Sequence, residues 1–204
     1  MKILMHVCCA PCFCYPSRAL KKEHELTGYW YNPNIQPYSE YLRRLETLKI
    51  FEKLENMHVI YNEEYNIHDW LKKATTVDEL DNVKRCEFCY MQRLSKVAKY
   101  AKDQNFDTFS TSLLYSPYQK HEIVKELGEK MALKYDIKFY YEDFRDHYKE
   151  GQEIAKSLKL YRQKYCGCLF SEFCKINSSN SKLLQTDFMW SEIVNDKRVI
   201  NHGL

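Results

Sequence analysis

The sequence lacks long hydrophobic runs, internal repeats and long low-complexity tracts. No stretch reaches the roughly 18 consecutive apolar residues that a membrane-spanning helix needs. The opening stretch Met1–Val7 is too short for a secretory signal and leads directly into cysteine. We therefore expect a cytoplasmic protein with no membrane partner.

A strong excess of charge of one sign is also lacking, because the formal net charge is only +3. That balance permits nucleic-acid binding without demanding it, since a local basic patch matters more than the total. The 204 residues suffice for one substantial domain and hardly for two. Seventeen tyrosines give a high aromatic share, and their polar tips suit the lining of a wet pocket.

Cysteine, in contrast, is abundant. Nine cysteines in a chain without an export signal are more typical of metal binding or catalysis than of disulfides, and their odd number fits a disulfide framework poorly. Burial of cysteine as a small hydrophobic residue accounts for roughly one to three cysteines in a domain of this size, fewer than the nine present. The cysteines are therefore the first indication of function.

Strand and helix patterns alternate along the chain. The run Lys2–Val7 reads as a buried strand, and apolar residues at helical spacing mark Tyr38–Glu55 (Tyr41, Leu42, Leu45, Leu48, Phe51) and Arg85–Lys102 (Met91, Leu94, Ala98, Ala101). The other expected strands are Tyr29–Tyr31, His58–Tyr61, Thr108–Leu114 and Ile137–Tyr141, and the other expected helices are Tyr15–Glu25, Ile67–Ala74, Gln119–Tyr135 and Tyr148–Leu158.

This alternation predicts an α/β fold, with a Rossmann-like, doubly wound parallel sheet covered by helices on both faces. Ligands of such folds bind beyond the carboxyl ends of the strands. We expect a single α/β domain over residues 1–174 that holds the cofactor. Residues 175–204 form a C-terminal tail whose role the sequence does not reveal.

The cysteines fall into three groups along the chain. Cys8, Cys9, Cys12 and Cys14 follow the first strand, Cys86 and Cys89 open a helix, and Cys166, Cys168 and Cys174 lie near the end of the predicted domain. A CxxC pair at a helix start places both thiols on one side, next to the positive end of the helix dipole.

The glycine between Cys166 and Cys168 lets both converge on one centre. The neighbours Cys8 and Cys9 point in different directions unless the loop kinks, so they could reach different iron atoms of one cluster. Four thiolates hold either a structural zinc ion or a [4Fe–4S] cluster. Spacing alone favours iron–sulfur and leaves zinc open.

Six motifs together resemble the QueH family of epoxyqueuosine reductases, over roughly residues 2–172 and in the same order. The motifs are His6–Cys12, Asn32–Ile35, Arg85–Tyr90 with Arg93-Leu94, Leu113–Gln119, Tyr141–Arg145 and Leu160–Cys168. A single CxxC is a weak signal, whereas six motifs in register are specific.

The resemblance implies an adenine nucleotide hydrolase-like superfamily fold. It also implies the cobalamin-independent removal of the epoxide oxygen from epoxyqueuosine at the tRNA wobble position, the last step of queuosine synthesis. The implied cofactors are a [4Fe–4S] cluster and an additional mononuclear metal ion, which we expect to be iron, and the implied partners are the tRNA and an external electron donor.

Carried onto this sequence, the resemblance assigns seven cysteines to metal binding. Cys14 and Cys174 are left as bystanders, although either could substitute for a ligand. We expect the cluster on one set and the second metal on another. The cluster set is Cys8, Cys9, Cys86 and Cys89, and the second-metal set is Cys12, Cys166 and Cys168.

Removing an epoxide oxygen to leave an alkene takes two electrons and a proton for the departing oxygen. Asp143 or Tyr118 could deliver that proton, since both follow predicted strands. Alternatively, Asp143 forms a structural ion pair with Arg145, and Tyr118 serves packing.

Arg145, Arg162, Gln163 and Gln119 are candidates for binding the tRNA substrate, whose unstacked anticodon bases are read by hydrogen bonds and stacking. The alternative is that they form a solvated helix terminus. His6 lies within a buried strand, so we expect a core histidine with satisfied nitrogens rather than a metal ligand.

Two other functions compete with the reductase. An ATP-dependent tRNA-modifying enzyme of the same fold needs a glycine-rich phosphate loop after the first strand, but Cys8–Cys12 contains no glycine and includes a proline. A zinc-stabilised, non-catalytic tRNA-binding module remains, and it predicts a colourless protein.

Overall fold

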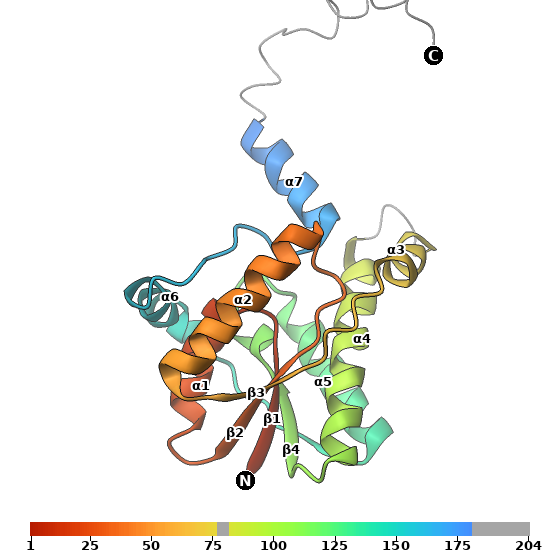
Figure 1. The fold of residues 1–204 in the computed structure, drawn as a ribbon. Coiled ribbons are helices and arrows are strands. Elements are labelled where there is room, and N and C mark those ends of the chain that lie inside the picture. The colour runs from red at the N-terminus through yellow and green to blue at the C-terminus, as the bar shows by residue number, and fades with distance from the viewer. Residues whose placement is uncertain (77–81, 181–204) are drawn as a thin grey trace, which may run out of the picture. The chain divides into compact units, whose positions relative to one another are not determined.

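The computed structural model describes residues 1–76 and 82–180 (Figure 1). The chain divides into two compact units, Met1–Lys164 and a second unit that begins at Tyr165. In the second unit, helix α7 spans Leu169–Asn180. No helix in the described part of the chain is both long and apolar enough to cross a membrane.

A five-stranded sheet forms the centre of the first unit, and all its neighbouring strands are parallel, in the order β3-β2-β1-β4-β5. The chain moves outward from β1 on one side and then returns to start β4 on the other side. This is the doubly wound topology that the sequence predicted. The strands are β1 Lys2–Val7, β2 Glu25–Trp30, β3 His58–Tyr61, β4 Thr108–Thr111 and β5 Lys138–Phe139.

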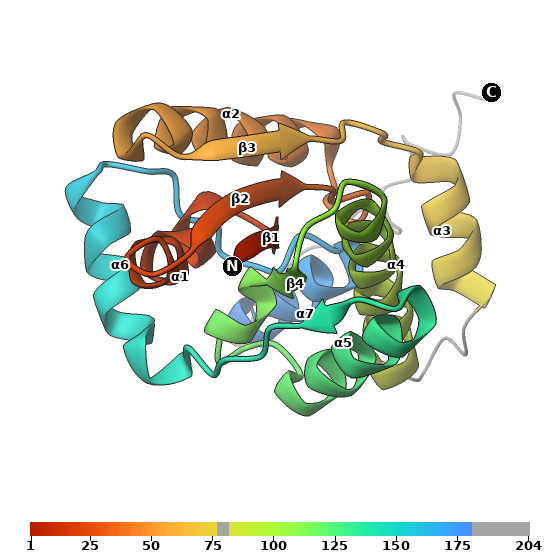
Figure 2. The same ribbon diagram turned by 90° about the horizontal axis from the view of Figure 1, so that it is seen from below.

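Helices cover both faces of the sheet. In the end-on view, α1 and α6 lie on one side and α4 and α5 on the other (Figure 2). The helices of this unit are α1 Ala10–Leu20, α2 Tyr38–Glu55, α3 Ile67–Thr76, α4 Asn82–Asp103, α5 His121–Tyr135 and α6 Tyr148–Ser157, with 3-10 turns at η1 Ser112–Tyr115 and η2 Arg145–His147.

Several predicted elements have other bounds in the structure. The strand expected over Tyr29–Tyr31 begins at Glu25 and ends at Trp30, and the strand expected over Ile137–Tyr141 covers only Lys138–Phe139. The helix expected over Tyr15–Glu25 begins at Ala10, because Pro11 is tolerated in a first helical turn, and Glu25 belongs to β2 instead. The strand expected over Thr108–Leu114 ends at Thr111. The Thr111 hydroxyl oxygen accepts the Leu113 N–H at 3.2 Å and caps the 3-10 turn that follows.

The buried stripes of α2 and α4 largely match the sequence pattern. Tyr41, Leu45, Leu48 and Phe51 of α2 are buried, as are Leu94, Ala98 and Ala101 of α4. Leu42 and Met91, which we expected on the same faces, are 37% and 38% exposed. Leu42 follows Tyr41 directly, so it is rotated by about 100° away from the buried face.

Candidate metal centre at the carboxyl end of the sheet

The first cysteines lie at the point where the sheet topology reverses. Cys8 follows β1 directly, and its backbone N–H donates to the Ser112 hydroxyl, just past β4, at 3.0 Å. The Ser112 hydroxyl in turn donates to the Cys8 Sγ at 3.3 Å. Two neighbouring strands thus fix this thiol at the position where doubly wound sheets bind ligands.

Three thiols converge there. The Sγ atoms of Cys8, Cys9 and Cys12 all lie within 4.8 Å of one another, and those of Cys8 and Cys9 are 3.8 Å apart. Cys12 comes from the first turn of α1. Two sulfurs bound at 2.3 Å to one tetrahedral ion are about 3.8 Å apart, so the spacing suits a shared metal.

Burial and mutual hydrogen bonding divide the three thiols. Hydrogen bonds with Cys12 and Cys9 hold the pKa of Cys8 well below its usual range, despite burial. Burial raises the pKa of Cys9, and the hydrogen bond with Cys8 together with burial raises that of Cys12. One thiolate is therefore supported by two thiols, and deprotonating all three calls for a bound cation.

Cys86 and Cys89 lie on α4, but this helix begins at Asn82 rather than at Arg85. The pair is therefore shifted inward from the helix start, where the dipole effect is strongest. Cys89 is buried, and its Sγ accepts a hydrogen bond from the Arg93 guanidinium at 3.2 Å. A buried cation thus provides the charge compensation that we had assigned to the dipole.

His6 is a satisfied core histidine, as expected. Its Nδ1 lies 3.0 Å from the Thr111 hydroxyl, and its Nε2 lies 3.2 Å from the Tyr31 carbonyl and 3.3 Å from the Asn32 side-chain oxygen. Burial, assisted by the charge of Arg93, lowers the pKa of His6 to about 4. The ring is therefore neutral at pH 7 and supports the end of β1.

Asp143 is paired with Arg145. Their closest side-chain atoms are 2.6 Å apart, and both side chains are partly exposed. The hydrogen bonds from Arg145 lower the pKa of Asp143 to about 2, so the carboxyl group is ionised at neutral pH. The ion pair that we weighed as the alternative is present, and the catalytic role of Asp143 stays a prediction.

Tyr118 and Gln119 lie in the loop between η1 and α5. Tyr118 is 80% exposed, and its ring packs edge-on against Tyr148. The Gln119 side-chain oxygen accepts a hydrogen bond from the hydroxyl of Tyr90, on α4, at 2.9 Å. Gln119 is therefore held by α4, the helix that also carries Cys86 and Cys89.

Arg162 and Gln163 follow α6 in an extended segment. Arg162 is exposed, as a residue that binds a phosphate should be. Gln163 turns inward instead, and its Nε2 donates to the Cys9 Sγ at 2.6 Å. The Gln163 side chain therefore contacts the Cys9 thiol. Its role in binding substrate stays a prediction.

Cys166 and Cys168 belong to the second unit. The Cys166 thiol donates to the Ser171 hydroxyl at 3.0 Å, and this hydroxyl donates to the Cys168 carbonyl at 3.1 Å. Between them Gly167 has a φ of 112°, a conformation that favours glycine. Cys174, expected to be a bystander, is exposed on α7.

Cys14, the other expected bystander, is buried in α1. Its thiol donates to the Ala10 carbonyl at 3.3 Å, and burial raises its pKa to about 12. It therefore behaves as an inert core residue.

Sequence reasoning missed Arg44 and Glu40 of α2. Both are buried, and the Arg44 Nε donates to a Glu40 carboxylate oxygen at 2.7 Å. A signal was present, because position 44 lies on the same helical face as the apolar residues Tyr41 and Leu48. A charged pair on a buried face is costly unless the two residues are paired with each other or with a further charge.

Comparison with known proteins places this site in a family. The family model described as epoxyqueuosine reductase QueH matches residues 3–173. The chain belongs to the QueH family. Among curated relatives, the epoxyqueuosine reductase QueH of Dehalococcoides mccartyi is 35% identical over 181 residues, covering 88% of this chain and 97% of that protein. The QueH of Thermotoga maritima is 35% identical over 175 residues, covering 83% and 89% of the two chains.

One solved structure extends the fold assignment beyond QueH. The U34-tRNA thiolase NcsA from Methanococcus maripaludis, solved with its [4Fe–4S] cluster, matches 100% of this chain and 78% of its own, with a TM-score of 0.54 and 15% identity. At that identity the likeness concerns the fold alone.

Proposed function

We propose that this QueH family member removes the epoxide oxygen from epoxyqueuosine at the tRNA wobble position to give queuosine. The observation that carries the proposal is the group of three sulfurs, Cys8, Cys9 and Cys12, at the carboxyl end of the sheet. Similarity to proteins named epoxyqueuosine reductase, over 83–88% of this chain, supports the same reaction.

The three thiols of Cys8, Cys9 and Cys12 fit the chemistry of an iron–sulfur cofactor. Soft thiolate ligands favour iron–sulfur clusters, zinc or copper(I) over magnesium or calcium. The structural neighbour NcsA carries a [4Fe–4S] cluster on the same fold, and its name places its action on tRNA. When bound, a cluster supplies electrons singly, from an external donor, to a reaction that consumes two.

The sulfur spacing favours one common centre for Cys8, Cys9 and Cys12. Cys86 and Cys89 on α4, and Cys166 and Cys168 in the second unit, are the proposed sources of further ligands for the cluster and for a second mononuclear metal. The assignment of Cys12 to the second metal, made from the sequence, is untested. Because of the sulfur spacing we propose instead that Cys12 serves the common centre, and a Cys12→Ala variant distinguishes the two assignments.

Tyr118 is the proposed proton donor. The Asp143 carboxyl group is ionised at neutral pH and accepts rather than donates a proton, whereas Tyr118 presents an exposed phenolic hydroxyl, which is a hydrogen-bond donor. Arg162, with its exposed guanidinium, is proposed to bind an anticodon phosphate. Arg145 and Gln119 are further candidates for substrate contact.

The test is iron, sulfide and zinc analysis of anaerobically purified protein, with a visible spectrum and an epoxyqueuosine-tRNA reduction assay. About four or more irons per chain, a broad absorbance bleached by dithionite, and formation of queuosine are expected. Stoichiometric zinc without a chromophore, even after reconstitution with iron and sulfide, would refute the reductase. It would favour the zinc-stabilised tRNA-binding module.

A further inference from the structure

Helix α2 carries a buried arginine next to the thiol group. Arg44 is 2% exposed, and its Nε donates to a Glu40 carboxylate oxygen at 2.7 Å. Glu40 lies one helical turn earlier and is 6% exposed. Burying a full positive charge is expensive, and a single carboxylate partner repays that cost only when the geometry is good.

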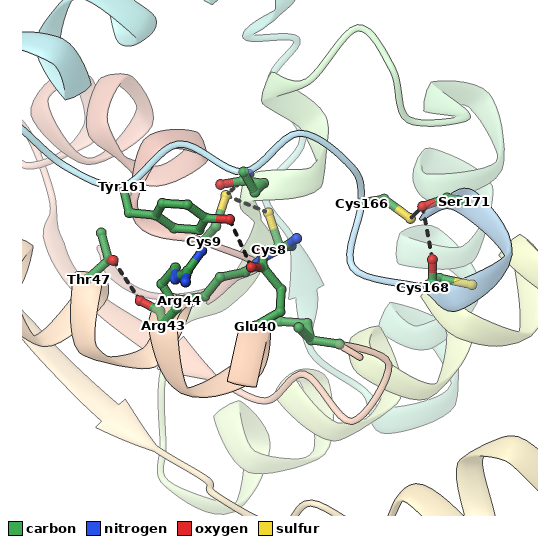
Figure 3. A network of polar contacts seen from close by, with 12 residues as sticks. Cys8, Cys9, Glu40, Arg43, Arg44, Thr47, Tyr161, Cys166, Cys168 and Ser171 are labelled. Atoms are coloured by element: carbon green, nitrogen blue, oxygen red, sulfur yellow. Dashed lines mark hydrogen bonds and ion pairs between the residues drawn. The ribbon is translucent and has the colours of Figure 1, made fainter. Parts of the chain in front are cut away.

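The segment after α6 completes this network. The Tyr161 hydroxyl donates to the second Glu40 oxygen at 2.8 Å, so both carboxylate oxygens are occupied. Two residues later, the Gln163 side-chain nitrogen donates to the Cys9 Sγ at 2.6 Å. One short stretch of chain therefore contacts both α2 and the three thiols. Figure 3 shows its first contact, from the Tyr161 hydroxyl to Glu40.

Arg44 interacts electrostatically with the thiols as well as with Glu40. Burial by itself lowers the pKa of Arg44, yet the neighbouring Cys9 and Glu40 raise it above its ordinary value. In Figure 3 the Arg44 side chain lies beside Glu40 and below Cys9. The guanidinium of Arg44 is thus paired with the Glu40 carboxylate and lies next to Cys9, which becomes an anion when it binds a metal as a thiolate.

We infer that Arg44 and Glu40 form a charge-balancing pair that sets the reduction potential of the metallocentre at Cys8, Cys9 and Cys12. Arg44 is a positioning residue, since it acts on the thiolates rather than on the substrate. The inference rests on the proposed function, because it presupposes a redox centre on these thiols. Nothing in the family resemblance or in the sequence motifs assigned either residue a role.

The charges of Arg44 and Glu40 shift the reduction potential of the centre in opposite directions. Reduction adds an electron to a centre that thiolates already make anionic, and the net charge nearby and hydrogen bonds to sulfur shift its potential. A cation favours the reduced form, and an anion favours the oxidised form. Removing the Arg44 charge therefore lowers the potential, and removing the Glu40 charge raises it.

The experiment is a dithionite redox titration of the reconstituted holoprotein, followed by its visible spectrum. The variants are Arg44→Gln, Glu40→Gln and the double variant, with Arg44→Lys as the charge-conserving control. Each single loss of charge is expected to change the one-electron equilibrium constant about tenfold, equivalent to about 59 mV. The double variant and Arg44→Lys are expected to stay near the wild-type potential.

The sign pattern separates charge balance from general loss of structure. Equal potentials in all variants, or shifts of both single variants in the same direction, would overturn the inference. If Arg44→Gln does not fold with Glu40 left buried and unpaired, the upward shift of Glu40→Gln and the near-wild-type value of the double variant still decide the matter.

Failure of the proposed function has a different signature. A wild-type protein that takes up zinc alone would refute the redox centre. The inferred effect of Arg44 and Glu40 on a reduction potential would then be refuted with it. The charge balance between Arg44 and Glu40 can still be tested by measuring the Zn²⁺ affinity of the apoprotein, because a zinc ion bound to three thiolates carries a net negative charge. Arg44→Gln is then expected to weaken binding and Glu40→Gln to strengthen it, and unchanged affinities would overturn the charge balance too.

Discussion

The Asn32 side chain supports the strand end that carries the thiols. Asn32 is buried, its Nδ2 donates to the Val7 carbonyl at 2.8 Å, and its oxygen lies 3.3 Å from His6 Nε2. Val7 is the last residue of β1, directly before Cys8. The change Asn32→Leu keeps the approximate shape and removes both contacts, leaving a buried carbonyl without this donor.

The expected loss follows from those contacts. A buried acceptor that loses its partner costs about 1–3 kcal/mol. We take about 2 kcal/mol, which for a chain of this length lowers the Tm by about 6 °C. Residues that orient metal ligands from behind contribute about 10–100-fold to metal affinity, so Zn²⁺ affinity of the apoprotein is expected to fall by about that factor.

Thr108→Val is the matched control. Thr108 is buried at the start of β4, at the opposite end of the sheet, and its hydroxyl donates to the Lys138 carbonyl at 2.8 Å. It should lower the Tm by a similar amount and leave Zn²⁺ affinity unchanged. The assays are thermal unfolding and competition with a chromophoric chelator. Equal losses of affinity in both variants, or none in Asn32→Leu, would refute a specific support of the thiols by Asn32.

Three further predictions concern the site and its surroundings. Cys12→Ala is expected to lose the iron of the common centre in metal analysis, whereas retention of all cluster iron would show that Cys12 serves a separate metal. The depressed pKa of Asp143 stabilises the fold above pH 4 and this contribution is lost as the pH falls through about 2. Because Asp143 is 37% exposed, we expect Asp143→Asn to lower the free energy of unfolding in urea at pH 7 by less than about 1 kcal/mol. The difference in stability between this variant and the wild type should shrink below pH 4. A difference that grows as the pH falls would contradict the prediction. In Gly151→Ala the added Cβ would overlap the Tyr115 hydroxyl. The destabilisation by overpacking, about 1–3 kcal/mol, outweighs the gain of about 1 kcal/mol in helix propensity, so we expect a lower Tm. A higher Tm would show that the Tyr115 side chain moves aside.

The order of strands and helices was readable from the sequence because each element buries one regular face. Lys2–Val7, Tyr38–Glu55 and His58–Tyr61 were predicted to the residue, since apolar periodicity ends where the element ends. The start of α1 was not readable. Its first turn consists of Ala10, Pro11 and cysteine, a composition that loops share, and tertiary packing made it helical.

The site was predictable in composition and less so in geometry. Motifs placed Cys8, Cys9 and Cys12 after the first strand, but spacing along the chain did not show that all three sulfurs meet within 4.8 Å. That convergence depends on the turn of the backbone between β1 and α1. The inward position of Gln163 depends on a contact more than 150 residues apart in sequence, which local pattern does not encode.

Anion binding explains why this loop holds thiols where other folds of the type hold phosphates. The loop opens α1, whose amino end favours negative charge, but Pro11 supplies no amide hydrogen for a phosphate oxygen. The buried cations Arg44 and Arg93 face Cys9 and Cys89 instead. A compact anion with its own metal needs charge compensation more than a full cradle of amides. A loop without glycine can therefore serve a thiolate centre at this strand end when buried arginines lie beside it.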